Sequence, residues 1–425
     1  MIEKLQSVLE NNKNKYISRL SDIVAIDTQD IGHGIEGGLE KEGQDYLIEM
    51  FQNMGASVEV DQVTEEVIQR AIEEFQEGNP GHNYENRYNV YAKFKGGEGK
   101  SIMFNGHMDT MPPGDVDLWD IPPHKATVKD GKLFGLGAAD MKGGLMASIM
   151  AVELLKDAGI KLPGDVIITS VIDEEGGGNG SIAAAMNGQT ADAVVVCEPT
   201  DYELTVAHMG FVFFKVEVEG IAVHSGSKWL GVNAIEKSQK LMDAINELEH
   251  NWLMKYKHAL LPSPTSNVGV IEGGTAGSTV PSYCSFSTCV HYLPELMNYE
   301  DVIKEYKKVI YRACEGDEWL KDHKPKISIY QAGGGFEMDI DHPFVGSFKD
   351  SFKMAMGKEV DIVGSPAGCD SRIWRNIANL PTLQYGPGRQ SECHAVNEYI
   401  GIKQYLDAIL IYANLIVNWC NIKEE

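Results

Sequence analysis

The first half of the chain alternates short apolar runs with an apolar helical segment. GGLMASIMAVELLKDAG at 143–159 is apolar on all sides and stops at a glycine, which predicts a helix that crosses between strands. The continuous, partly β-branched runs indicate strands buried on both faces of a sheet. These runs are SIMFN at 101–105, VIITSVI at 166–172 and AVVVC at 193–197. Together they predict an α/β architecture.

From about residue 208 the pattern changes to strict alternation. In FVFFKVEVEG at 211–220, valine and phenylalanine occupy one face and charged side chains the other, which predicts a strand buried on one side. The order β, α, β, β, α, β that follows is that of a ferredoxin-like domain. Its further elements are expected as a helix at 233–248, strands at 267–271 and 283–293, a helix at 299–313 and a strand at 326–330.

The last part of the chain returns to the first pattern. PTLQYGPG at 381–388 and the apolar helical segment at 401–419 resemble the strands and helix of the first half. We therefore predict that the ferredoxin-like domain, 206–325, is inserted into a larger α/β domain made of 1–205 and 326–425.

Composition narrows the classes of function. A net charge of -25 and a pI near 4.9 repel nucleic acid and anionic membrane surfaces. Seven cysteines, an odd number without a CxxC pair, favour reduced thiols over a disulfide framework. No apolar run reaches the length of a membrane span, and the charged amino terminus does not resemble an export signal. We expect a cytoplasmic protein whose partners are small molecules or metal cations.

Ionisable side chains gather after the predicted strands, where ligands bind in α/β sheets. Any one of them alone is more often a helix cap or a solvated charge, so their joint placement carries the argument. Carboxylates that converge on an imidazole repel one another unless a divalent cation neutralises them, and this ligand set suits zinc, manganese or cobalt. The residues are His107, Asp109, Asp173, Glu174, Glu175 and Glu198, with Asp140 just before the predicted helix.

A second interpretation comes from GNGSIA at 178–183. This segment matches the G-x-G-x-x-A dinucleotide pattern, follows a predicted strand and precedes Glu198 by about 20 residues. On that pattern the protein would be an NAD-dependent oxidoreductase. Against it, the acidic DEE at 173–175 occupies the strand exit that a pyrophosphate would approach.

Six motifs occur along the chain in the order found in a known family. They are GHMDT, GAADMKGG, DEEGGG, CEP, AVHSGSKWLGVNAI and GRQSECHAVNEYI. With them the chain resembles the co-catalytic zinc peptidases and deacylases, which include acetylornithine deacetylase, succinyl-diaminopimelate desuccinylase, aminoacylase and carboxypeptidase G. The resemblance covers almost the whole sequence. It implies an α/β fold with a zinc-peptidase-like, mixed-sheet catalytic domain, in which the inserted ferredoxin-like domain serves as a lid and for dimerisation.

The resemblance also implies a ligand set. His107 and Glu198 would hold one metal, Glu175 and His394 the other, and Asp140 would bridge them. The implied cofactor is two zinc ions per chain, with cobalt or manganese as alternatives. The peptide bond that follows Asp140 is expected to be cis, as in the family.

Three further residues receive roles by the same resemblance. Asp109 would orient His107, as a carboxylate often does for a metal-bound imidazole. Glu174 would accept the proton of the attacking water and deliver it to the leaving nitrogen. His224 would reach the active site of a partner subunit and donate a hydrogen bond to the oxyanion, which implies a homodimer.

The chain departs from the family where relatives bind the substrate carboxylate. Where many relatives have an asparagine, this chain has Ser278 or Thr279, and where they have an arginine, it has His291. Leu136 stands in place of another arginine ahead of Asp140. Two arginines remain that could grip a carboxylate in bidentate fashion. The candidate substrate-binding residues are His291, Arg372 and Arg389.

The sequence thus predicts a metal-dependent amide hydrolase that cleaves an N-acyl amino acid or a small peptide, as a deacetylase, another deacylase or a dipeptidase. A metal-binding homologue that has lost catalysis is a further alternative, although the retention of Glu174 argues against it.

Overall fold

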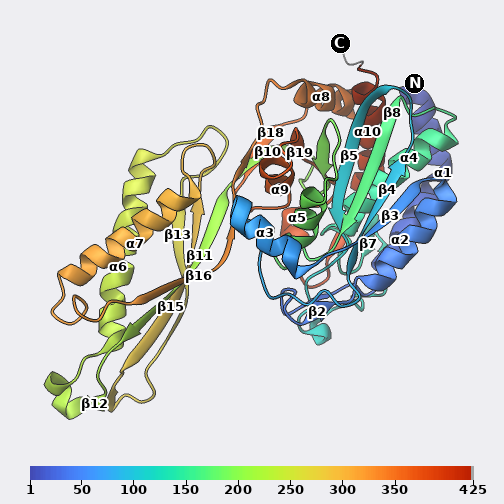
Figure 1. Ribbon diagram of the computed structural model, residues 1–425. Helices are drawn as coiled ribbons and strands as arrows, with labels where there is room; N and C mark the ends of the chain where they lie inside the picture. Colours follow the sequence, from blue (N-terminus) through green and yellow to red (C-terminus); the bar gives the residue numbers. More distant parts are fainter. Residues whose placement is uncertain (423–425) are drawn as a thin grey trace. The chain divides into compact units, whose positions relative to one another are not determined.

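The computed structural model describes residues 1–422, which form two compact units (Figure 1). The first unit contains Met1–Val206, Met338–Val363 and the chain from Cys369 onward. The second contains Ala207–Glu337 and Gly364–Gly368. Its border lies at Glu337 and not at the expected 325, because the strand Lys326–Gly333 pairs with Gly210–Glu219 inside this unit. The assignment of 326–337 to the larger domain was therefore wrong.

Most of a mixed sheet of nine strands lies in the first unit. Its order is β17-β10-β19-β9-β5-β8-β4-β3, and β18 pairs with β10. The pairs β8·β5, β5·β9 and β9·β19 are parallel, whereas the outer pairs are antiparallel. The strands are β3 (Ser57–Gln62), β4 (Tyr88–Phe94), β5 (Gly99–His107), β8 (Gly164–Val171), β9 (Val194–Val196), β10 (Leu204–His208), β17 (Phe336–Glu337), β18 (Ile362–Ser365) and β19 (Thr382–Gln384).

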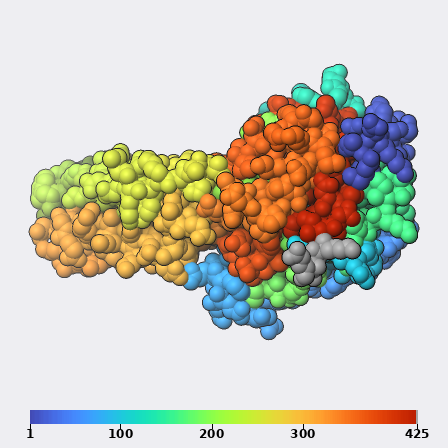
Figure 2. All heavy atoms as spheres, turned by 90° about the horizontal axis from the view of Figure 1, so that it is seen from above, coloured from blue at the N-terminus to red at the C-terminus, as the bar shows by residue number. Residues whose placement is uncertain are grey.

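Helices cover both faces of this sheet (Figure 1). They are α1 (Ile2–Val24), α2 (Lys41–Met54), α3 (Glu65–Phe75), α4 (Lys142–Asp157), α5 (Asn179–Met186), α8 (Pro343–Met356), α9 (Ser371–Asn376) and α10 (Ile402–Cys420). Short elements connect them: β1 (Asp30–Ile31), β2 (Gly37–Gly38), β6 (Thr127–Lys129), β7 (Lys132–Phe134), β20 (Tyr399–Gly401), and the 3-10 turns η1 (Val116–Leu118) and η3 (Gln390–Glu392). In Figure 2, α8 in orange lies beside α10 in red, against which it packs.

The apolar runs of the sequence become strands because both of their faces are covered. Met103 in β5 packs in a cluster with Ala184 of α5 and Trp374 of α9, while its neighbour Phe104 contacts Tyr412 of α10 with ring centroids 4.9 Å apart. The expected strands at 101–105, 166–172 and 193–197 and the helix at 143–159 are confirmed as β5, β8, β9 and α4. Gly144 allows α4 to pack closely on the end of β9, since a Cβ there would lie 1.9 Å from the carbonyl oxygen of Cys197.

The second unit is an antiparallel sheet of four strands with two long helices. The order along the chain is β11 (Gly210–Glu219), α6 (Ala234–Lys255), β13 (Thr265–Gly273), β15 (Tyr283–Tyr292), α7 (Tyr299–Glu315) and β16 (Lys326–Gly333), and the sheet order is β13-β15-β11-β16. A small pair, β12 (Val223–His224) with β14 (Thr279–Val280), and η2 (Ser225–Leu230) complete the unit.

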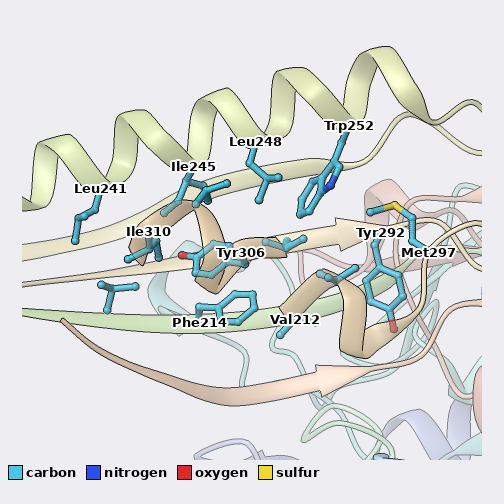
Figure 3. Close-up of a cluster of buried hydrophobic side chains, with 14 of the residues drawn as sticks. Val212, Phe214, Leu241, Ile245, Leu248, Trp252, Tyr292, Met297, Tyr306 and Ile310 are labelled. Carbon is cyan, nitrogen blue, oxygen red and sulfur yellow. The ribbon is translucent and has the colours of Figure 1, made fainter. Parts of the chain in front are cut away.

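The core of the second unit lies between this sheet and its helices (Figure 3). Val212 and Phe214 point from β11 toward Leu241 and Ile245 of α6, which is the face that the alternating pattern predicts. Phe214 stacks on Tyr306 of α7 with ring centroids 3.9 Å apart. No helix within residues 1–422 combines the length and the apolar character that a membrane span requires.

Candidate metal centre

The parallel strands of the first unit bring ionisable side chains to one edge of the sheet. His107 is the last residue of β5, the Asp173–Glu175 segment follows β8, and Glu198 follows β9. Because β8, β5 and β9 are parallel neighbours, their carboxyl ends meet. Asp140 precedes α4, and His394 follows η3.

His107 lies at the centre of the resulting cluster. Its Nε2 is 3.2 Å from Oδ1 of Asp140, 3.7 Å from Oε1 of Glu198 and 4.0 Å from Oε2 of Glu174. Two sets of side chains have potential ligand atoms within 4.8 Å of one another: His107 with Glu174 and Glu198, and His107 with Asp140 and Glu175. Such sets have the composition of a divalent metal site.

Asp140 faces both histidines of the cluster. Its Oδ1 points to His107, whereas its Oδ2 lies 3.4 Å from Nε2 of His394. The same nitrogen of His394 is 3.0 Å from Oε2 of Glu175. One carboxylate thus stands between two groups of potential ligands. The Asp140–Met141 peptide bond is cis, as expected from the resemblance.

Asp109 contributes differently from the expected carboxylate–imidazole contact. Nδ1 of His107 lies 2.9 Å from the main-chain carbonyl oxygen of Asp109 and 3.7 Å from its nearer carboxylate oxygen. The other carboxylate oxygen, Oδ2, accepts a hydrogen bond of 2.9 Å from the main-chain N–H of Glu175. Asp109 therefore holds the imidazole through its main chain and the Glu175 segment through its side chain.

The charges in the cluster are unbalanced. Within residues 1–422, the carboxylates of Asp140, Glu174, Glu175 and Glu198 form ion pairs with histidines but with no lysine or arginine. Burial raises the pKa of Glu175 and Glu198, and the nearby Asp140 adds to both shifts. Hydrogen bonds to Asp140 and Glu175 raise the pKa of His394 to about 11. These raised pKa values show that the cluster favours an added positive charge. A bound divalent cation would supply that charge.

Asp140 is the exception among these carboxylates. Burial opposes its ionisation, but hydrogen bonds from His107 and His394 outweigh burial and hold the pKa of Asp140 well below its usual range. An ionised carboxylate between two imidazoles is the group best suited to be shared by two cations.

The remaining candidate residues lie outside this cluster. His224 and His291 belong to the second unit; His224 is exposed and its Nδ1 accepts a hydrogen bond from the N–H of Gly226. Nδ1 of His291 is buried and has no hydrogen-bond partner among residues 1–422. Arg389, in the first unit, is 56% exposed and forms an ion pair of 3.2 Å with Asp201.

Arg372 does not have the surroundings expected of a substrate-binding residue. It is 2% exposed, and Nε donates to Oε2 of Glu77 at 3.0 Å. Its Nη1 donates to the carbonyl oxygen of Cys369 at 2.8 Å and Nη2 to that of Gly177 at 2.9 Å. The guanidinium thus makes its hydrogen bonds inside the protein, and we no longer count Arg372 among the residues that could bind a substrate carboxylate.

The space around the glycines of the segment at 178–183 is occupied by other protein atoms. It forms the start of α5, but a Cβ on Gly178 would meet Ile373, Asp370 and Arg372, and one on Gly180 would lie 2.1 Å from the carbonyl oxygen of Ile172. A pyrophosphate needs open space at this helix start. The dinucleotide pattern is therefore explained by the packing of α5 against β8.

Sequence reasoning missed buried charged residues that hold the cluster in place. Glu398 accepts hydrogen bonds from the main-chain N–H groups of Gly137, Ala139 and Asp140 at 2.8–3.1 Å. Arg87 binds the segment that follows β8. A single charged residue beside a strand carries no spacing pattern, so only the fold reveals these contacts.

Comparison with known proteins agrees with this geometry. Residues 103–418 match the sequence model of peptidase family M20/M25/M40. A curated N-formyl-4-amino-5-aminomethyl-2-methylpyrimidine deformylase from Halalkalibacterium halodurans is 28% identical over 100% of this chain and 99% of its own length. An acetylornithine deacetylase from Vibrio campbellii is 28% identical over 88% of this chain and 90% of its own. The solved structure of a dipeptidase from Saccharomyces cerevisiae has a TM-score of 0.75 at 16% identity, covering 100% of this chain and 99% of that one, which is a likeness of fold.

Proposed function

The chain belongs to peptidase family M20/M25/M40 and is a metallohydrolase acting on C–N bonds, and we propose that it removes the acyl group from a small N-acylated amine or amino acid. The observation that carries the proposal is the position of Asp140 between His107 and His394. We propose His107 and Glu198 as ligands of one metal, Glu175 and His394 as ligands of a second, and Asp140 as the ligand that both share. Divalent ions held there would polarise the amide carbonyl and make water more acidic.

We assign the proton transfers to Glu174. Its carboxylate borders the cluster at 4.0 Å from Nε2 of His107, and it neighbours Glu175 in the chain. Burial, followed by the nearby Asp370, raises the pKa of Glu174 well above its usual range. A carboxylate with a raised pKa binds a proton more readily, so it can both accept the proton of the attacking water and release it to the leaving nitrogen.

Two substrate classes deserve separate tests. An N-acyl amino acid or a dipeptide presents a carboxylate, for which Arg389 and His291 are the proposed partners. A neutral N-formyl amine needs no such partner, and the burial of Arg372 favours this second candidate. The relative from H. halodurans is named as a deformylase of an aminomethylpyrimidine, which supports an N-formylated heteroaromatic amine as the first compound to test.

The decisive experiment is hydrolysis of a substrate panel by protein loaded with zinc, cobalt or manganese. The panel contains N-formyl-4-amino-5-aminomethyl-2-methylpyrimidine, N-acetylornithine, other N-acetyl and N-succinyl amino acids, and dipeptides; released amine is quantified. Turnover of one subgroup that disappears with a chelator and returns with metal supports the proposal. Metal-loaded protein that hydrolyses none of these amides contradicts it.

We further propose that the protein works as a homodimer through its second unit. β13 is an edge strand of the four-stranded sheet, and Val270 and Ile271 on it are each 51% exposed. An exposed apolar edge strand is a ready template for pairing with another chain. The exposed His224 is the proposed donor to the oxyanion in the partner's active site.

A further inference from the structure

A buried arginine holds the segment that carries Glu174 and Glu175. Arg87 precedes β4, and its Nη2 lies 3.2 Å from Oδ1 of Asp173, the residue before Glu174. The same guanidinium binds Glu40 through Nε at 3.0 Å and Asp30 through Nη2 at 3.4 Å. Arg87 and all three carboxylates are fully or almost fully buried.

Asp173 is bound from two sides. Besides Arg87, its carboxylate contacts His82, whose Nδ1 lies 2.8 Å from Oδ2. The residue has a left-handed backbone with a φ of 61°. Its carbonyl oxygen accepts a hydrogen bond of 3.0 Å from the N–H of Gly178, and that of Glu174 accepts one of 2.7 Å from Gly177. The side chain of Asp173 thus anchors the first residue of a tight turn.

The far end of this turn is anchored as well. The carbonyl oxygen of Gly177 accepts hydrogen bonds from Nη2 of Arg372 at 2.9 Å and from Nδ2 of Asn79 at 3.3 Å. Between the two anchors, Glu175 is held by its N–H, which donates to Asp109. The carboxylate of Glu174 lies 4.0 Å from Nε2 of His107, which is beyond hydrogen-bonding distance, so the backbone of the turn is the main support that presents Glu174.

We propose that Arg87 is a positioning residue, which acts through Asp173 to hold the backbone that presents Glu174 and Glu175 to the metal centre. The role assumed for these two glutamates rests on the proposed function. The anchoring of the turn does not, because it can be measured without substrate or metal. A displacement of about 1 Å at a reacting group can lower a rate a hundredfold, so we expect loss of this anchor to lower the turnover rate.

Glu40 provides a matched control. Arg87 binds Glu40 and Asp173 through the same guanidinium, but only Asp173 adjoins the proposed base. Asp173→Gly removes the anchoring carboxylate and tolerates the left-handed backbone. Glu40→Gln removes one buried charge beside Arg87 and leaves the contact with Asp173 intact. A purely structural role of Arg87 predicts that turnover falls with stability in both variants alike.

The first measurement is hydrogen exchange in metal-free protein, followed by mass spectrometry of the peptide that contains residues 173–180. We expect faster exchange at Gly177 and Gly178 in Asp173→Gly and wild-type exchange in Glu40→Gln. The second is steady-state kinetics on the substrate that the panel identifies. We expect kcat to fall by about tenfold to a hundredfold in Asp173→Gly with KM changed by less than about twofold, and a wild-type kcat in Glu40→Gln.

Three outcomes overturn the proposal: equal effects of the two variants, unchanged exchange in Asp173→Gly, or faster exchange with unchanged kcat. Arg87→Lys is the second variant should Asp173→Gly not fold. It keeps the positive charge but lacks the planar fork that reaches several carboxylates, so the same pattern is expected. If wild type hydrolyses no amide of the panel, the proposed function fails, and the exchange result alone decides whether Arg87 anchors the turn.

Discussion

The imidazole of His107 is oriented by the main chain of Asp109, with 2.9 Å between Nδ1 and the carbonyl oxygen. A carbonyl oxygen can only accept, so Nδ1 carries the hydrogen. The lone pair of the neutral ring is then on Nε2, which faces Asp140 and Glu198. The backbone thereby selects the tautomer that can bind a metal through Nε2.

Because His107 is held by the main-chain carbonyl of Asp109, the negative charge of the Asp109 side chain should matter less than its ability to accept a hydrogen bond from the N–H of Glu175. Asp109→Asn keeps the main-chain carbonyl and an oxygen able to accept from the N–H of Glu175, so kcat/KM should fall by less than about tenfold. Asp109→Ala loses that acceptor and should lower kcat/KM or metal affinity by about 10- to 100-fold, the usual cost of removing a group that supports a metal ligand. Kinetics and metal analysis check this. An asparagine variant as impaired as the alanine variant would show that the negative charge is what matters.

The neighbouring glutamates should differ in what they lose. Glu174→Gln should lower kcat by about a hundredfold or more while the metal content stays that of wild type, because general-base catalysis is commonly worth 10² to 10⁴. Glu175→Gln is the matched control and should lose metal, since Glu175 is a proposed ligand. Kinetics combined with elemental analysis separates the two roles. Retained turnover in Glu174→Gln would assign the proton transfer to another group.

Arg372 should affect stability and not substrate affinity. Its guanidinium is buried with Glu77, and breaking one side of a buried ion pair costs about 3–5 kcal/mol. Arg372→Met should therefore lower the free energy of unfolding in urea by that amount, and the double variant with Glu77→Gln should recover part of it. Arg389→Ala, at an exposed ion pair, should change stability by less than about 1 kcal/mol. A raised KM for carboxylated substrates alone, with unchanged stability, would return Arg372 to the substrate site.

Asp317 should contribute a pH-dependent part of the stability of the second unit. Burial opposes its ionisation, but hydrogen bonds from Lys237 and Lys240 and from the N–H groups of Leu320 and Trp319 hold the pKa of Asp317 well below its usual range. Since the folded pKa is lower than the unfolded value of about 3.9, the stabilisation is complete above about pH 5 and lost as pH falls below it. In thermal unfolding, Asp317→Asn should destabilise the protein most at pH 7, somewhat less at pH 3, and least once the pH falls below the folded pKa. An equal effect at all of these pH values would contradict this.

The proposed action of His224 across a dimer can be tested by mixing two inactive proteins. Glu174→Gln supplies an intact His224, and His224→Ala supplies an intact Glu174. After random subunit exchange, about half of the dimers are mixed, and each has one complete site of two, so activity should recover to roughly a quarter of wild type. Size-exclusion chromatography and labelled subunits verify the exchange. Verified exchange without recovery would exclude a role of His224 in the partner's site.

The sequence predicts the buried strands and the edge of the sheet where the ionisable side chains gather, because both depend on local patterns. A continuous apolar run such as SIMFN at 101–105 predicts a buried strand and, within a few residues, the position of its carboxyl end, which the structure places at His107. The alternation through Val212 and Phe214 predicts which face of β11 is buried. Each of these inferences needs only the residues of one segment.

Contacts between distant segments could not be predicted in this way. Arg372 and Glu77 are far apart in the sequence, so nothing local distinguishes an arginine that binds a buried glutamate from one that binds a substrate. The choice between the carbonyl and the carboxylate of Asp109 depends on a loop conformation that residue spacing does not determine. The boundary expected at 325 was too early, although the strand expected at 326–330 already belonged to the ferredoxin-like order, and its pairing with β11 shows that it lies inside the second unit.

The position of β19 and His394 late in the chain has a consequence for biosynthesis. β9 and β10 are consecutive strands along the chain, yet β19 lies between them in the sheet, and α10 packs against α4 and β5. A ribosome that has released only the first 337 residues has delivered almost all of the second unit, but neither this missing strand nor the second imidazole. Until β19, His394 and α10 have been synthesised, the apolar α4 lacks part of its cover and the carboxylates lack the second imidazole of the cluster, so the growing chain exposes apolar surface that favours aggregation.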